Sequence, residues 1–104
     1  MEEKEQLDEL LPVGSIVLLR DAKKKLMIAA IMQIKNDRIF DYLGVPYPEG
    51  YIGAKSCILF DHENISEVVA RGYEDAERKK YLEFLKLTYE ASNQVLASLR
   101  RDSE

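Results

Sequence analysis

The polar links between the first apolar runs of this chain are very short, and no other feature constrains the fold as much. The run VGSIVLLRD (13–21) is followed through DAKKK by KKLMIAAIMQI (24–34), and KNDR (35–38) leads into RIFDYL (38–43). Parallel neighbouring strands need a crossover of a dozen or more residues, whereas a hairpin needs only a few. We therefore expect three consecutive antiparallel strands, with no room for a helix before residue 61.

Two later runs are also typical of strands. SCILF (56–60) follows a stretch rich in Tyr, Pro and Gly, DYLGVPYPEGYIG (41–53), and ISEVVARGY (65–73) follows a polar turn. The second run could instead begin a helix that Gly72 ends, but its β-branched residues favour a strand. The sequence thus predicts five short strands before residue 74.

From about Glu74 the apolar spacing changes from two to 3.6 residues, which predicts one long helix over 75–100. Acids in its first turn and arginines in its last fit the helix dipole. At 1.5 Å per residue this helix is about 39 Å long, whereas a compact body of the preceding residues is about 25–30 Å across. We therefore expect its end to project. Its apolar stripe consists of Leu82, Leu85, Tyr89, Leu96 and Leu99, widened by Tyr81, Phe84 and Val95.

These elements predict an α+β, mainly β fold: a small five-stranded antiparallel SH3-like barrel or bent sheet, followed by one long C-terminal helix. We expect a single domain in which residues 1–11 form an acidic arm, residues 12–73 the β domain, and residues 74–101 a helix packed on it and projecting from it. Leucines of the arm, at helical spacing, could cover the apolar stripe of the helix within the same chain.

The net charge of −4 lies in the arm, because residues 1–11 carry five acids and one lysine and leave 14 acids against 14 bases in residues 12–104. A neutral body argues against nucleic acid as a partner. The longest apolar stretch, LMIAAIM (26–32), is shorter than the roughly 20 residues of a membrane span, and the acidic N-terminus is unlike a signal peptide. We expect a cytoplasmic protein.

The sequence contains no constellation typical of an enzyme. His62, the only histidine, lies in a polar turn, where histidine is more often a capping or solvated side chain than a base. No third residue completes a nucleophilic relay with His62 and Cys57, the only cysteine, and zinc-type spacing is absent. The glycines of 44–53 lack the strand-to-helix context of a phosphate loop. We expect no catalysis, metal or cofactor.

Two surfaces are candidates for protein binding. The stretch 41–53 is either a structural corner, with prolines and glycines that set its backbone, or a ridge that presents Tyr42, Tyr47 and Tyr51 to a partner; the two hypotheses are compatible. The helix is the second candidate, through Tyr89, Val95, Leu96 and Leu99. A homodimer through this helix is also open, because a seam at 82, 85, 89, 92, 96 and 99 has only Ser92 out of character.

Several of these stretches together resemble one bacterial family, the domain of unknown function numbered 4176. The stretches are LPVGSIVLL (11–19), KKLMI (24–28), DYLGVPYPEGYIG (41–53) and FDHENISEVVARGYEDAE (60–77). The resemblance spans about residues 11–84, and its specific part is a YPEG-type corner paired with a downstream GYED. Members occur in Gram-positive bacteria, commonly in gene neighbourhoods of the type VII secretion system, beside LXG-type toxins and small helical targeting proteins.

This resemblance implies a cytoplasmic accessory role and brings no catalytic residues. We therefore expect a non-catalytic module that acts as chaperone or adaptor for an LXG-type effector, with the effector or its helical targeting proteins as the partner. Two alternatives remain open. One is an immunity protein that neutralises a cognate toxin, and the other is a small ligand-binding barrel in which His62 and nearby acids line a pocket.

Overall fold

The computed structural model describes residues 10–88 of a chain that divides into two units, Leu10–Tyr73 and the residues on either side of it. The unit Leu10–Tyr73 is a β-sheet with two single-turn 3-10 helices. Its elements are β1 (Ile16–Leu19), β2 (Leu26–Lys35), β3 (Arg38–Pro46), η1 (Ala54–Ser56), β4 (Ile58–Phe60), η2 (His62–Asn64) and β5 (Ile65–Ala70).

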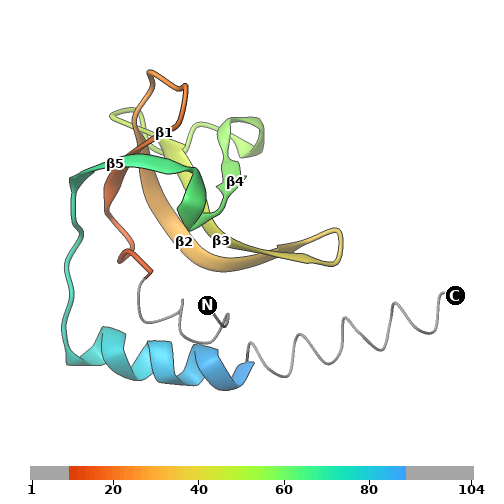
Figure 1. The fold of residues 1–104 in the computed structure, drawn as a ribbon, viewed down its shortest axis with the longest axis vertical. Coiled ribbons are helices and arrows are strands. Elements are labelled where there is room, and N and C mark those ends of the chain that lie inside the picture. Colours follow the sequence, from red (N-terminus) through yellow and green to blue (C-terminus); the bar gives the residue numbers. More distant parts are fainter. Residues whose placement is uncertain (1–9, 89–104) are drawn as a thin grey trace, which may run out of the picture. The chain divides into compact units, whose positions relative to one another are not determined.

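The five strands form one sheet in the order β4-β3-β2-β1-β5, and every neighbouring pair is antiparallel (Figure 1). The first and last strands are neighbours, since Ile16 pairs with Ala70 and Leu19 with Ile65. The predicted five-stranded antiparallel fold is confirmed. Of the two forms expected, the chain adopts the bent sheet, because β4 and β5 are its two edges and the sheet does not close into a barrel.

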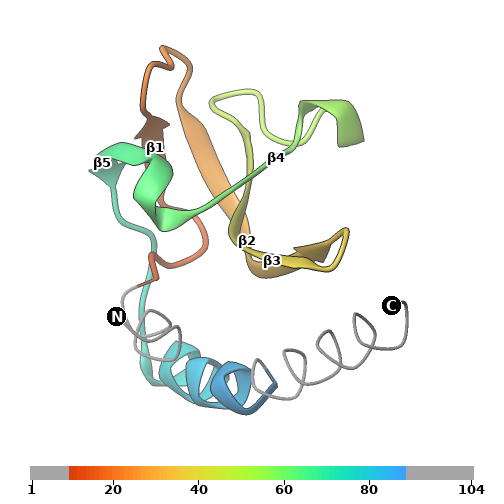
Figure 2. The same cartoon turned by 45° about the vertical axis from the view of Figure 1, so that its right-hand side comes forward.

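The β2–β3 hairpin is the longest part of the sheet, and its tip extends away from the other strands (Figure 2). The tip is the Asn-Asp pair predicted as a turn, with φ of 53° at Asn36 and 61° at Asp37, as a two-residue hairpin turn of this hand requires. Two irregularities bend β2 at positions farther from the tip. The register shifts between Ile28 and Ala30, and Met32 has a φ of 54°.

The start of the β unit is tied to its end by one buried hydroxyl. Ser15 is fully buried, and its Oγ donates to the carbonyl of Pro12 at 2.7 Å while it accepts the amide of Gly72 at 2.9 Å. Gly72 has no space for a side chain, because a Cβ there would lie 2.4 Å from the carbonyl oxygen of Val13. This close approach fixes the chain just after β5, where it leaves the β unit.

The other unit contains a helix, described over residues 76–88. Its first turn is capped by Asp75, whose Oδ1 accepts the amide of Arg78 at 3.0 Å, so the predicted start of the helix is confirmed. Within the described residues no helix is long and apolar enough to cross a membrane. The predictions for the arm (1–9) and for the end of the helix (89–101) lie outside those residues.

Met32 generates the first testable prediction, because its backbone is in the left-handed region that side chains disfavour. We expect Met32→Gly to be more stable than Met32→Ala by about 1 kcal/mol, since both variants lose the same side-chain packing and only glycine adopts this φ freely. The measurement is urea unfolding followed by circular dichroism. In an ordinary strand position alanine is the more stable of the two, so that order would show that Met32 has a normal strand conformation.

Candidate functional site

The three tyrosines of the corner do not share one environment. Tyr42 lies within β3 and is 0% exposed, whereas Tyr47 and Tyr51 lie in the following loop and are 43% and 69% exposed. The surface that the corner offers to a partner therefore contains Tyr47 and Tyr51, and Tyr42 belongs to the interior. The helix candidates Tyr89, Val95, Leu96 and Leu99 lie outside the described residues.

The hydroxyl of Tyr42 joins two distant segments. It accepts the amide of Leu11 at 2.9 Å and lies 2.7 Å from Nδ1 of His62. The phenolic oxygen therefore has hydrogen-bond partners in two segments outside β3, at Leu11 and at the turn that contains His62. The exposed ring of His62 also packs against that of Tyr42, with centroids 5.9 Å apart. His62 thus binds the hydroxyl of a buried tyrosine.

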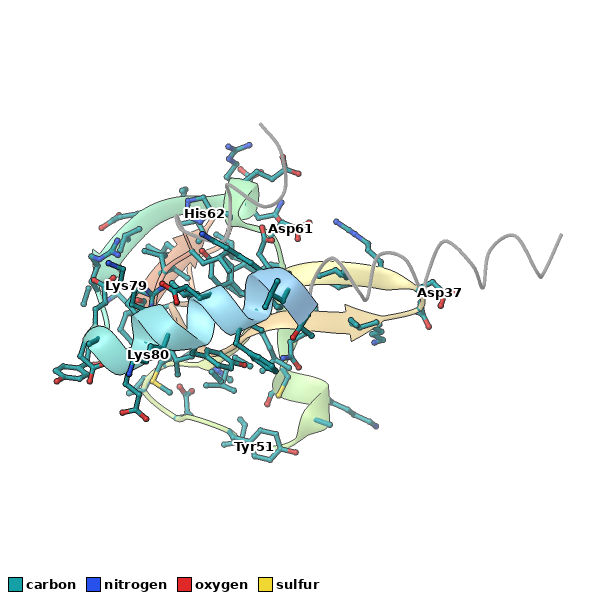
Figure 3. The ribbon with its side chains drawn as sticks, turned by 90° about the horizontal axis from the view of Figure 1, so that it is seen from below. Asp37, Tyr51, Asp61, His62, Lys79 and Lys80 are labelled. Atoms are coloured by element: carbon teal, nitrogen blue, oxygen red, sulfur yellow. The ribbon has the colours of Figure 1, made fainter. Side chains whose placement is uncertain are left out.

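Two aspartates fix the turn that carries His62 against β3. The amide of Asp41 donates to Oδ1 of Asp61 at 3.1 Å, and the amide of His62 donates to Oδ2 of Asp41 at 2.9 Å. Asp61 also forms an ion pair with Arg38 and a capping box with Asn64 across η2. Figure 3 labels Asp61 and His62 on this turn. The aspartate of β3 therefore accepts a backbone amide of the turn, and the aspartate of the turn accepts a backbone amide of β3.

Of these two aspartates, Asp41 has a carboxylate whose charge is unfavourable in the folded protein. Burial raises the pKa of its carboxyl above the usual value, the hydrogen bond from the amide of His62 opposes that rise, and the nearby charge of Asp61 adds to it. The carboxylate thus carries its charge at a cost to stability near neutral pH.

Among the described residues, no group of three or more His, Cys, Asp or Glu side chains is placed to hold a metal ion.

The corner loop after β3 is held by three backbone hydrogen bonds. The amide of Gly50 donates to the carbonyl of Pro46 at 2.7 Å, that of Tyr47 to Lys25 at 3.0 Å, and that of Ser56 to Gly53 at 3.1 Å. The peptide bond between Tyr47 and Pro48 is cis, and Gly50 and Gly53 have positive φ. The loop is therefore fixed at both ends and in the middle.

The turn between β1 and β2 lies against this loop. Besides the Tyr47–Lys25 backbone bond, Nζ of Lys24 lies 2.7 Å from Oε1 of Glu49. The hydrogen bond from Lys24 lowers the pKa of the Glu49 carboxyl. Two of the three consecutive lysines, Lys24 and Lys25, thus contact the corner loop, which the sequence alone did not predict.

Exposed apolar side chains extend the corner beyond its tyrosines. Ile52 is 64% exposed, and Ile58 at the start of the edge strand β4 is also exposed. Figure 3 shows Tyr51 on the loop between β3 and η1. Sequence reasoning missed Ile52, although one signal was available: it lies between Gly50 and Gly53 in a stretch with no strand periodicity, where no sheet face covers it.

The described part of the helix separates the predicted apolar stripe into two faces. Leu82 and Leu85 are buried, whereas Tyr81, Phe84 and Leu87 are exposed. The rings of Tyr81 and Phe84 are neighbours, with centroids 6.4 Å apart. Successive residues of a helix are 100° apart, so these two sets point in different directions. Tyr81 and Phe84, together with Leu87, therefore form an exposed face of their own.

Removing the hydroxyl of Tyr42 tests its bridging role. We expect Tyr42→Phe to lower the free energy of unfolding by about 1–3 kcal/mol, because the buried amide of Leu11 loses its acceptor and Nδ1 of His62 loses its hydrogen-bond partner. The matched control is Tyr51→Phe, which removes the same atom from an exposed ring and should change stability by less than about 0.5 kcal/mol. Equal effects in the two variants would show that the Tyr42 bridge contributes nothing.

Neutralising Asp41 tests the cost of its charge. Because its pKa is raised in the folded state, the contribution of this carboxyl to stability becomes more favourable as the pH falls from 7 towards 4 and the carboxyl takes up a proton. We expect Asp41→Asn, whose Oδ1 can still accept the amide of His62, to be at least as stable as the wild type at pH 7. The difference should shrink towards pH 4 in urea unfolding measured across that range.

The control for this pH series is Asp61→Asn. This variant loses the ion pair with Arg38 and should be less stable than the wild type at pH 7. If Asp41→Asn were destabilised as much as Asp61→Asn at pH 7, the two carboxylates would contribute alike, and the cost assigned to Asp41 would be wrong.

Comparison with known proteins assigns the sequence to a family. No curated protein and no solved structure matches the chain significantly. The model of one family, described as a domain of unknown function (DUF4176), matches residues 10–81. This match includes the whole sheet, the Tyr42 bridge, the corner and the first turns of the helix, which is more than half of the chain. The chain therefore belongs to the DUF4176 family.

Proposed function

We propose that this chain is a non-catalytic protein-binding module of a Gram-positive type VII secretion system. In this proposal it works in the cytoplasm as a chaperone or adaptor for an LXG-type effector. The observation that carries the proposal is the corner, where Tyr47, Tyr51 and Ile52 are exposed on a loop held by backbone hydrogen bonds. Aromatic side chains on a fixed backbone lose little conformational entropy on binding, so they are effective contact residues.

The resemblance to secretion-associated proteins supports the choice of partner. It rests on the corner and the downstream GYED stretch, and both lie within the residues that the family model matches. The exposed face of the helix, with Tyr81 and Phe84, supports a second contact surface. Of the predicted contacts, Val95 has the spacing of Tyr81 and Phe84, whereas Tyr89, Leu96 and Leu99 have the spacing of Leu82 and Leu85. In this proposal they contact the same partner, or join two copies of the chain in a homodimer.

The test is co-expression of the full chain with an LXG-type effector encoded beside it, followed by size-exclusion chromatography with light scattering. We expect a stable complex of defined mass. The double variant Tyr51→Ser plus Ile52→Ser should weaken it more than tenfold, because it removes the most exposed apolar side chains of the corner. Tyr73→Ser is the matched control, since Tyr73 is also exposed but follows β5. Leu96→Asp plus Leu99→Asp tests the helix and the homodimer in the same assay.

The outcomes separate the adaptor from its alternative. An adaptor should raise secretion of the full effector without protecting cells that express the toxic domain alone. Protection against that domain, with secretion unchanged, would identify an immunity protein instead. Absence of any complex with the effector or its helical targeting proteins would contradict the proposed function.

A further inference from the structure

Three segments of the β unit form one surface at the same end of the sheet. They are the turn between β1 and β2 (20–25), the corner loop (46–53) and η1 with Cys57 (54–57); we call their combined face the corner surface. The first two are joined by the Tyr47–Lys25 backbone bond and the Lys24–Glu49 ion pair. Figures 1 and 2 both show these loops at the end of the sheet away from the tip of the β2–β3 hairpin.

The corner surface is positive although the chain as a whole is acidic. Segments 20–25 and 46–57 contain five bases and two acids, a net charge of +3, whereas the whole chain has −4. Lys24 is neutralised by Glu49. Lys23, Lys25 and Lys55 are exposed, and the structure as described gives none of these three an ion-pair partner. The segments that expose Tyr47, Tyr51 and Ile52 therefore also carry three exposed lysines.

We propose that the corner surface binds an acidic peptide segment that carries aromatic or aliphatic side chains, as part of a partner protein. This inference rests on the proposed function and names the chemistry of the segment that is bound. Apolar side chains of the peptide would pack on Tyr51 and Ile52, and its carboxylates would lie near Lys23, Lys25 and Lys55. Charge complementarity of this kind directs association and selects the partner.

Nucleic acid also binds surfaces of lysine and tyrosine, but two observations favour a peptide. Residues 12–104 carry 14 acids and 14 bases, whereas nucleic-acid binding usually needs a strongly basic domain, and the three exposed lysines of the corner surface suffice only for a short acidic segment. Ile52 is 64% exposed beside Tyr51, and an aliphatic side chain gains more from apolar peptide side chains than from stacked bases. The test includes nucleic acid as a separate outcome.

The experiment sorts a random peptide display library on the purified full chain and then measures the best peptide by fluorescence anisotropy. We expect enriched peptides to be acidic and to contain Phe, Leu, Ile or Tyr. The measured Kd should rise with sodium chloride, because exposed charge pairs are screened. A counterpart of the best peptide, with each acid replaced by lysine, should bind at least tenfold more weakly.

Two pairs of charge changes give a matched comparison. Lys23→Gln plus Lys25→Gln removes two charges from the corner surface, and we expect a fivefold to tenfold weaker Kd for the acidic peptide. Lys79→Gln plus Lys80→Gln removes two charges from the exposed surface of the helix and should leave the Kd unchanged. Tyr51→Ser plus Ile52→Ser should weaken binding more than tenfold. Circular dichroism spectra of all three variants should match that of the wild type, which would exclude misfolding as the cause.

Several outcomes would overturn the proposal. These are enrichment of basic or uncharged peptides, enrichment of no peptide, or equal effects of the two lysine pairs. Tighter binding of a fluorescent oligo-dT than of the best peptide, at the same salt concentration, would assign the corner surface to nucleic acid. If the effector complex forms and is weakened neither by the Lys23/Lys25 variant nor by the Tyr51/Ile52 variant, this inference fails and the proposed function stands. If acidic peptides bind the corner but no effector complex forms, the proposed function fails and this inference stands.

Discussion

The hydroxyl of Tyr42 connects three parts of the β unit that are far apart in sequence: the start of the unit at Leu11, the middle of β3 and the turn at His62. Its ring is fully buried and lies 5.3 Å from that of Phe60 in β4. Gly44 makes that packing possible, since a Cβ there would lie 2.9 Å from the Phe60 ring. One side chain, that of Tyr42, thus provides both hydrogen bonds and aromatic packing. If it is removed, its hydrogen-bond partners lose their bonds.

The same strand that is fixed inside by Tyr42 ends at Pro46 and leads directly into the exposed corner. The corner therefore begins at a backbone that cannot move without disturbing the core. Its further bonds, to Lys25 and through Lys24, connect it to a second fixed element, the start of β2. The structural and the recognition hypotheses for the tyrosine-rich stretch thus apply to different residues: Tyr42 stabilises, and Tyr47 and Tyr51 are available to a partner.

Local physics explains what the sequence predicted. Short links require hairpins, the Asn-Asp pair tolerates positive φ, and an aspartate before a helical period caps a helix, so the strands, the tip at 36–37 and the helix start at Asp75 could all be predicted. Interactions between distant residues could not. Nothing near β5 indicates that it pairs with β1, and nothing near Tyr42 shows that Leu11 and His62 both reach its hydroxyl.

The site was predicted only in part for the same reason. Tyr47 and Tyr51 follow from the proline and glycine pattern around them, which marks a loop. From the sequence, the lysines of 23–25 resemble an ordinary solvated turn. Their place beside the corner depends on the hydrogen bond from the amide of Tyr47, after β3, to the carbonyl of Lys25, before β2, and this bond joins residues far apart in the sequence. Met32 gave no signal at all, since methionine has no preference for the left-handed backbone that it adopts here.

The pairing of β1 with β5 also determines the order in which the sheet can assemble. β1 has only two paired positions with β2, at Ile16 and Val17, and four with β5. The β2–β3 hairpin closes through a two-residue turn, whereas β1 must wait for its second neighbour, β5, which lies beyond residue 64. Contacts between such distant residues slow folding, because the entropy of closing a long loop is lost before they form. During synthesis, the N-terminal strand would therefore be among the last to have both of its native neighbours.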